Sequence, residues 1–147
     1  MGQISKPKPV NLIIGVLTSI PALLSEIDKT LEGYFGHIDL RSDILPFNFT
    51  DYYTEDMGKG ILRQFNSFED LIMPDEIPSI KVQTNHIEEY ATSSNKYAVQ
   101  RPINVDPGYI NESRLILAST KDFSHRIYLR EGIYAEVTLH YRKGVYE

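Results

Sequence analysis

The sequence has 147 residues, carries a formal net charge of -5 and contains no cysteine. This length suits one domain with its own core. The lack of thiols excludes disulfides, thiolate nucleophiles and thiolate metal sites, and it favours a cytoplasmic protein. Residues 51–90 carry nine acidic and three basic side chains, whereas residues 114–147 carry four acidic and six basic ones. Because a nucleic acid requires a broad basic face and a membrane span needs about 18 apolar residues in a row, we expect neither partner.

A short tail, a strand and a helix are predicted at the start of the chain. Residues 1–8 read as a flexible tail and residues 9–147 as a single α+β domain. The continuous apolar run Pro9–Leu17 predicts a strand covered on both faces and therefore central in its sheet. Residues 21–36, PALLSEIDKTLEGYFG, repeat apolar side chains at helical spacing, with a proline in the first turn and a glycine after the end. Ser19 is a candidate N-cap for this first helix.

Two strands and a second helix are predicted next. The segments DILPFNFT, residues 43–50, and GILRQFNSF, residues 60–68, are rich in apolar and aromatic residues and are expected to pair antiparallel. Residues 74–91 open with a proline and two acidic residues, which is typical of a helix start. One face of this helix would carry Ile77, Ile80, Thr84, Ile87 and Ala91.

The last third of the chain reads mainly as strands. Residues 103–110 predict a short strand broken at Pro107, and residues 125–141 predict a hairpin. Residues 112–120 fit a helix or a strand. The order strand, helix, strand, strand, helix, strand predicts a ferredoxin-like βαββαβ sandwich with an added C-terminal hairpin.

The apolar residues of the hairpin also predict its register. Setting them beside one another places Arg126 opposite Glu136 and requires a three-residue turn over Arg130–Gly132. On this register the two charged side chains form a cross-strand ion pair, so we interpret them as structural.

Five segments resemble those of one prokaryotic family: KPKPVNLIIGVLTS, FGHIDLRSDILPFNFTDYY, RQFNSFEDLI, RPINVDPGYI and LILASTKDFSHRIYLREGIYAEVTLHYRKG. Across nearly its whole length the chain is similar to the domain-of-unknown-function family 4416. The resemblance implies no established activity, although some members of that family carry a GTP-binding label. The family usually continues past YRKG into an aromatic tail, and we expect any contribution of that tail to be missing here.

The sequence lacks the motif with which P-loop proteins hold GTP. That motif, Gly-x4-Gly-Lys-Ser/Thr, surrounds the phosphates with backbone amides and a lysine, and no such run occurs. The segment Thr120–Asp122 resembles part of a guanine-reading Asn/Thr-Lys-x-Asp motif, but its aspartate comes one position too early. A nucleotide would therefore have to be held in another way.

The start of the first helix is the candidate site for a small anion, such as a phosphorylated metabolite or a nucleotide. Thr18 and Ser19 leave the first strand here, beside backbone amides that have no partner within the helix. Lys121 and Arg126 are the candidate counter-charges, and Thr120 is a further ligand-binding candidate. Plain helix capping is the alternative interpretation of Thr18 and Ser19.

Lys121, His125 and Asp106 are the candidate catalytic residues, since a lysine, a histidine and a carboxylate can move protons or assist a nucleophile. No nucleophile motif accompanies them, so the sequence leaves open whether the protein is an enzyme, and it indicates no cofactor. We expect no metal site, because Glu136 and His140, on one face of a strand, would lie about 13 Å apart. The contrasting hypothesis is a non-catalytic protein-interaction or homo-oligomeric module that uses its ten tyrosines.

Overall fold

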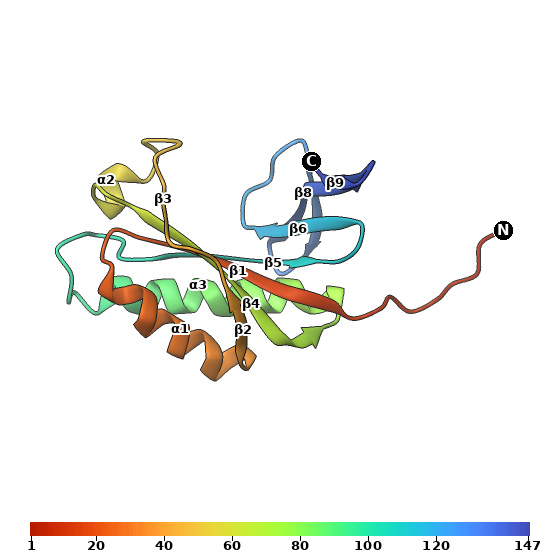
Figure 1. The fold of residues 1–147 in the computed structure, drawn as a ribbon, viewed down its shortest axis with the longest axis horizontal. Coiled ribbons are helices and arrows are strands. Elements are labelled where there is room, and N and C mark those ends of the chain that lie inside the picture. The colour runs from red at the N-terminus through yellow and green to blue at the C-terminus, as the bar shows by residue number, and fades with distance from the viewer.

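The computed structural model describes all residues, 1–147. It contains three α-helices and a sheet of nine strands (Figure 1). In chain order the elements are β1 (Val10–Thr18), α1 (Ala22–Phe35), β2 (Ile38–Arg41), β3 (Leu45–Pro46), α2 (Thr54–Met57), β4 (Leu62–Ile72), a short 3-10 helix (Pro74–Glu76), α3 (Ile77–Ser93), β5 (Asn104–Ile110), β6 (Arg114–Ser119), β7 (Arg126–Arg130), β8 (Ile133–Arg142) and β9 (Val145–Tyr146).

The sheet is antiparallel and has the strand order β2-β4-β1-β5-β6-β8-β7, with β3 beside β4 and β9 beside β8. The helices α1 and α3 lie on the same face of the sheet, and the residues before β1 extend away from the body (Figure 1). No helix combines the length and the apolar character needed to cross a membrane. The predicted mixture of helices and strands is confirmed, although the sheet has more strands than expected.

The main core fills the space between the sheet and these two helices. In β1 the buried residues alternate with half-buried ones, so one face is fully covered and the other only partly. The core cluster draws on β1 and both long helices through Leu12, Ile14, Val16, Leu23, Leu24, Ile27, Leu31, Ile77, Ile80 and Ile87. The predicted first strand, its central place in the sheet and both predicted helices are therefore confirmed, whereas the predicted coverage of both faces of this strand is complete on one face only. The helices were predicted correctly because their apolar spacing matches the face that each one buries.

The strands between the helices differ from the prediction. The strand expected over residues 43–50 is reduced to the two residues of β3, and β2 was not predicted. Since only Ile38 of β2 is buried, this strand lacks the alternation that marks a half-buried strand. The strand β4 was predicted, and it pairs with β1 on one side and with both β2 and β3 on the other.

β5 runs unbroken through Pro107, contrary to the predicted interruption. It pairs with β1 from Asn104 to Ile110, but on its other side it pairs with β6 only from Gly108 onwards. Pro107 has no N–H group with which to continue a ladder of hydrogen bonds. The strands β5 and β6 therefore separate before this point, and the sheet opens between them.

The segment 112–120, for which the sequence left helix and strand open, forms β6. The strands β7 and β8 form the predicted hairpin with Arg126 facing Glu136, as predicted. The turn is one residue shorter than expected. Arg130 pairs with Ile133, so the turn consists of Glu131 and Gly132, which both have a positive φ, of 55° and 75°. Two left-handed residues suit the twist of hairpin strands better than the three-residue turn does.

Candidate ligand-binding cleft

Thr18 and Ser19 use their hydroxyl groups to hold neighbouring segments in place. The Thr18 hydroxyl is buried, donates to the carbonyl of Pro102 at 2.8 Å and accepts from the N–H of Ile20 at 3.0 Å. The Ser19 hydroxyl donates to the carbonyl of Met57. Neither hydroxyl caps α1, whose N-cap position is a proline. Both side chains also lie outside the polar cleft described next.

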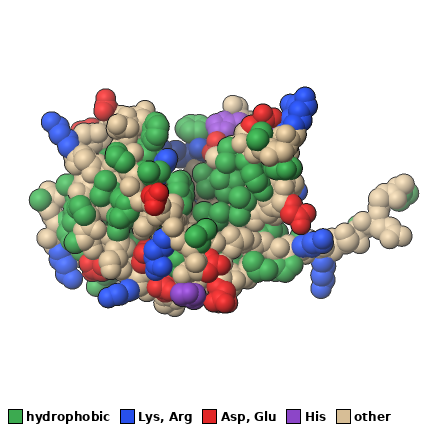
Figure 2. Space-filling view, viewed as in Figure 1, with side chains coloured by type: hydrophobic (Ala, Val, Ile, Leu, Met, Phe, Trp, Pro, Cys, Tyr) green, Lys and Arg blue, Asp and Glu red, His purple; other side chains and the backbone are tan.

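A polar cleft of about 410 Å³ lies where β5 and β6 separate. Its walls come from α3, from β5 and β6, from the segment before α2 and from the start of the C-terminal hairpin. Figure 2 shows the surface hollowed between the side that carries α2 and the side that carries β6 and β8, with basic side chains inside the hollow. The lining residues are Tyr52, Tyr53, Lys81, Asn85, Glu88, Glu89, Arg101, Asn104, Asp106, Leu117, Ala118, Ser119, Thr120, Lys121, Arg126 and Glu136.

The inner end of the cleft is organised around a buried lysine. Lys81 extends from α3 with only 7% of its side chain exposed, and its ammonium group lies 3.2 Å from Asp106 Oδ1 and 3.4 Å from the carbonyl of Val105. The other carboxylate oxygen of Asp106 accepts a hydrogen bond from Asn104 Nδ2 at 2.6 Å. Since a buried charge is stable only when it is paired and hydrogen-bonded, these contacts explain how the lysine is kept inside.

Glu88 and Arg101 extend this network. Glu88 Oε1 accepts a hydrogen bond from the N–H of Val105 at 2.5 Å, and Glu88 Oε2 lies 3.5 Å from Arg101 Nη2. The same guanidinium group donates to Asn104 Oδ1. Burial raises the pKa of Glu88 above its usual value, while the Val105 hydrogen bond and the charges of Lys81 and Arg101 act in the opposite direction.

Lys121 stands at the open end of the cleft. Its ammonium group donates to the hydroxyl of Tyr52 at 3.0 Å and lies 4.7 Å from the centre of that ring. The hydrogen bond and the positive charge of Lys121 lower the pKa of Tyr52. Lys121 has no carboxylate within 4 Å, whereas every other cation that lines the cleft has one.

Arg126 and His125 both contact Glu136, on the neighbouring strand β8. Arg126 Nη2 lies 3.2 Å from Glu136 Oε2, which confirms the predicted ion pair, and His125 Nε2 lies 2.9 Å from Glu136 Oε1. Arg126 also lies 4.6 Å from the centre of the Phe123 ring. His125 is more than half exposed and does not line the cleft itself, so it reaches the site only through Glu136.

The structure brings together Asp106, Thr120, Lys121 and Arg126, which the sequence proposed for different roles, and leaves Thr18 and Ser19 apart from them. The contributions of α3, Arg101 and the two tyrosines before α2 were not predicted from the sequence. One signal was available for α3. Lys81 comes four residues after the buried Ile77, and Glu88 comes four residues after the buried Thr84. Because residues four apart lie on the same side of a helix, both charged residues flank the apolar stripe. A charged residue next to a core stripe is often paired in the folded protein.

No group of three or more histidine and acidic side chains is arranged to hold a metal ion. The fold and the cleft define a mixed α/β protein with a paired ionic network in an opening of its sheet. The chain belongs to the family described as Domain of unknown function (DUF4416), whose model matches residues 8–147. No protein with a curated description and no solved structure matches the chain significantly.

Proposed function

We propose that the cleft binds a small anionic ligand, such as a phosphorylated metabolite or a nucleotide, and that Lys121 is its main contact. The observation that carries this proposal is the pairing of charges. Three cationic side chains of the cleft have carboxylate partners: Lys81, Arg101 and Arg126. The ammonium group of Lys121 has only the neutral hydroxyl of Tyr52. An unpaired cation at the mouth of a polar cleft attracts an incoming anion.

The backbone around Lys121 supports this role. Its N–H donates to the hydroxyl of Ser119 at 3.1 Å, and its carbonyl accepts from Arg126 Nη1 at 3.1 Å. These two bonds hold the backbone while the side chain stays exposed. Thr120 lines the same cleft and adds a hydroxyl group to it.

Thermal unfolding in the presence of inorganic phosphate, sugar phosphates and nucleotides tests the proposal. An anion present at a hundred times its Kd should raise the Tm by about 5–10 °C for a chain of this size. Lys121→Met should weaken the binding of that anion at least tenfold, while Lys29→Met, which removes an exposed cation from α1, should leave it unchanged. If no anion raises the Tm, or if Lys121→Met binds as tightly as the unaltered protein, the proposal is wrong.

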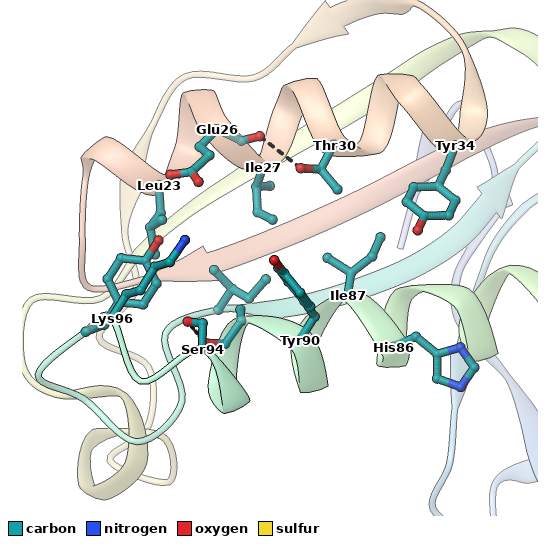
Figure 3. A pocket seen from close by; sticks show the side chains of 13 residues that line it. Leu23, Glu26, Ile27, Thr30, Tyr34, His86, Ile87, Tyr90, Ser94 and Lys96 are labelled. Carbon is teal, nitrogen blue, oxygen red and sulfur yellow. Dashed lines mark hydrogen bonds between the residues drawn. The ribbon is translucent and has the colours of Figure 1, made fainter.

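A second candidate function is self-association, favoured by a groove between α1 and α3 on the helical face. This groove has a volume of about 460 Å³ and is lined by three tyrosines, Tyr34, Tyr90 and Tyr97 (Figure 3). Tyr34 and Tyr90 are 59% and 74% exposed. Exposed tyrosines beside an apolar floor are typical of protein interfaces. Sedimentation velocity over a range of concentrations should show a dimer. Tyr90→Ala should abolish this dimer, whereas Tyr141→Ala, a control at an exposed site elsewhere, should retain it. A monomer at every concentration would exclude self-association.

We also infer that β1, α1, β2, β4, α3 and β5 form a ferredoxin-like core. The supporting observations are the element order along the chain, the sheet order β2-β4-β1-β5 and the presence of both helices on one face. On this interpretation β3, α2 and the strands after β5 are additions, and the cleft lies where the added strands leave the core.

A further inference from the structure

We propose that the anionic ligand is a phosphorylated sugar, with its phosphate beside Lys121 and its hydroxyl groups at the inner end of the cleft. This inference rests on the proposed function and names the ligand class for the same site. A volume of about 410 Å³ lies within the range of sites that enclose a small organic molecule, so a lone phosphate would leave much of the cleft unfilled.

The inner end offers hydrogen-bonding groups of both kinds. Asp106 is 43% exposed, and each of its oxygens accepts one bond within the protein, which leaves further lone pairs. Lys81 uses two of its three N–H donors. The half-buried amide of Asn85 lines the cleft and makes no hydrogen bond within the protein. A hydroxyl group matches this mixture because it donates one hydrogen bond and accepts others.

The charge balance favours hydroxyl groups over an ammonium group. At the inner end the carboxylates of Asp106 and Glu88 are paired with the cations of Lys81 and Arg101. A ligand ammonium would therefore meet two cations as well as two carboxylates, and it could not accept a hydrogen bond from either cation. Neutral hydroxyl groups can accept hydrogen bonds from the two cations and donate to the two carboxylates without adding charge.

Tyr52 and Tyr53 supply an aromatic wall for the carbon skeleton of the sugar. Their ring centres lie 5.0 Å apart and their planes are nearly perpendicular, at 89°. Burial raises the pKa of Tyr53 and thereby favours its neutral form. A sugar ring has an apolar face of C–H groups, which packs on such a surface while the hydroxyl groups at its edge point to the polar wall.

Isothermal titration calorimetry with inorganic phosphate, ribose 5-phosphate, glucose 6-phosphate and free ribose tests this assignment. The tighter of the two sugar phosphates should bind at least tenfold more tightly than inorganic phosphate. Asp106→Asn should reduce that preference to less than threefold, whereas Lys121→Met should weaken both ligands at least tenfold. Asn85→Ala makes the same test without altering the Lys81 ion pair, so a result is obtained even if Asp106→Asn does not fold.

The outcomes separate this inference from the proposed function. If inorganic phosphate binds as tightly as both sugar phosphates, the sugar assignment is wrong while the anion site stands. The same conclusion follows if Asp106→Asn and Asn85→Ala, both folded, keep the full preference. If none of the anions binds, the proposed function fails, and the sugar assignment fails with it.

Discussion

Glu88 carries its carboxylate in a place where burial opposes the charge. Only 15% of its side chain is exposed, and burial is the largest influence on its pKa, which is raised. The Val105 N–H and the cations of Lys81 and Arg101 offset this effect only in part. The ionised carboxylate therefore holds the network together and is itself less stable than it would be in water.

We expect Glu88→Gln to change how stability depends on pH. Because the pKa of Glu88 is higher in the folded chain than the ordinary value of 4.5, the folded state binds more protons in the interval between the two. The contribution of this carboxyl group to the free energy of unfolding thus falls as the pH rises through that interval. Glutamine keeps an acceptor for the Val105 N–H but does not titrate.

Urea unfolding of both proteins over a series of pH values measures this effect. The variant should gain stability relative to the unaltered protein as the pH rises from 4.5 through the raised pKa. A difference that stays constant over the series, or that changes in the opposite direction, would contradict a raised pKa at Glu88.

At the scale of elements, the packing of β5 against β6 depends on the absence of a side chain at Gly108. A Cβ atom there would overlap the carbonyl oxygen of Ile116 and would lie 2.7 Å from Leu117 Cδ2. The two strands pair only over the three residues from Gly108 to Ile110, so this close approach carries much of their contact and defines the edge of the cleft.

We expect Gly108→Ala to lower the free energy of unfolding by about 1–3 kcal/mol, as is usual when a group is forced into a packed site. Gly33→Ala is the matched control, because Gly33 lies in α1 and no atom of another element lies within 4 Å of the added Cβ. This control should raise the free energy of unfolding by roughly 0.5–1 kcal/mol, since alanine is the better helix former. Urea denaturation measures both changes, and a Gly108→Ala protein as stable as the unaltered one would show that β5 and β6 are not in close contact.

At the scale of the whole molecule, the sheet is covered unequally. The part built from β1, β4 and β5 is covered on one face by α1 and α3, and Leu31 of α1 is fully buried there. The hairpin of β7 and β8 has an alternating apolar face of its own, yet Ile127 and Val137 are 69% and 55% exposed. An apolar strand face predicts burial, and in this chain Ile133 at the start of β8 joins the core while Ile127 and Val137 stay exposed.

Two alanine substitutions compare how much the covered part of the sheet and the exposed face of the hairpin contribute to the free energy of unfolding. Leu31→Ala should reduce the free energy of unfolding by about 2–5 kcal/mol, because it leaves a cavity in the core. Ile127→Ala should change it by no more than about 0.5 kcal/mol, as for other exposed positions. Chemical unfolding at low protein concentration measures both. A loss at Ile127 comparable to that at Leu31 would mean that the hairpin face is covered in solution.

The sequence by itself determined the elements whose signals act over a few neighbouring residues. The apolar run of β1, the helical spacing of α1 and α3 and the Arg126–Glu136 register all follow from how side chains alternate on one strand or repeat on one helix. Elements with weak local signals were missed or displaced, such as β2, which buries only Ile38. Pro107 was wrongly predicted to break the strand. It ends the pairing of β5 with β6 but not with β1, and the sequence alone does not show which strands lie on the two sides of β5.

Only the tertiary structure decided the cleft. Lys81 and Glu88 lie on a helix, Asp106 lies on β5, and Lys121 follows β6, and no spacing along the chain says that these segments meet. These segments meet because β5 and β6 separate beside Pro107, which leaves an opening in the sheet. Polar side chains of α3 reach this opening, which continuous hydrogen bonding between the two strands would have closed. The pairing of charges there depends on distances of a few ångströms between residues far apart in sequence, and those distances are a property of the folded chain alone.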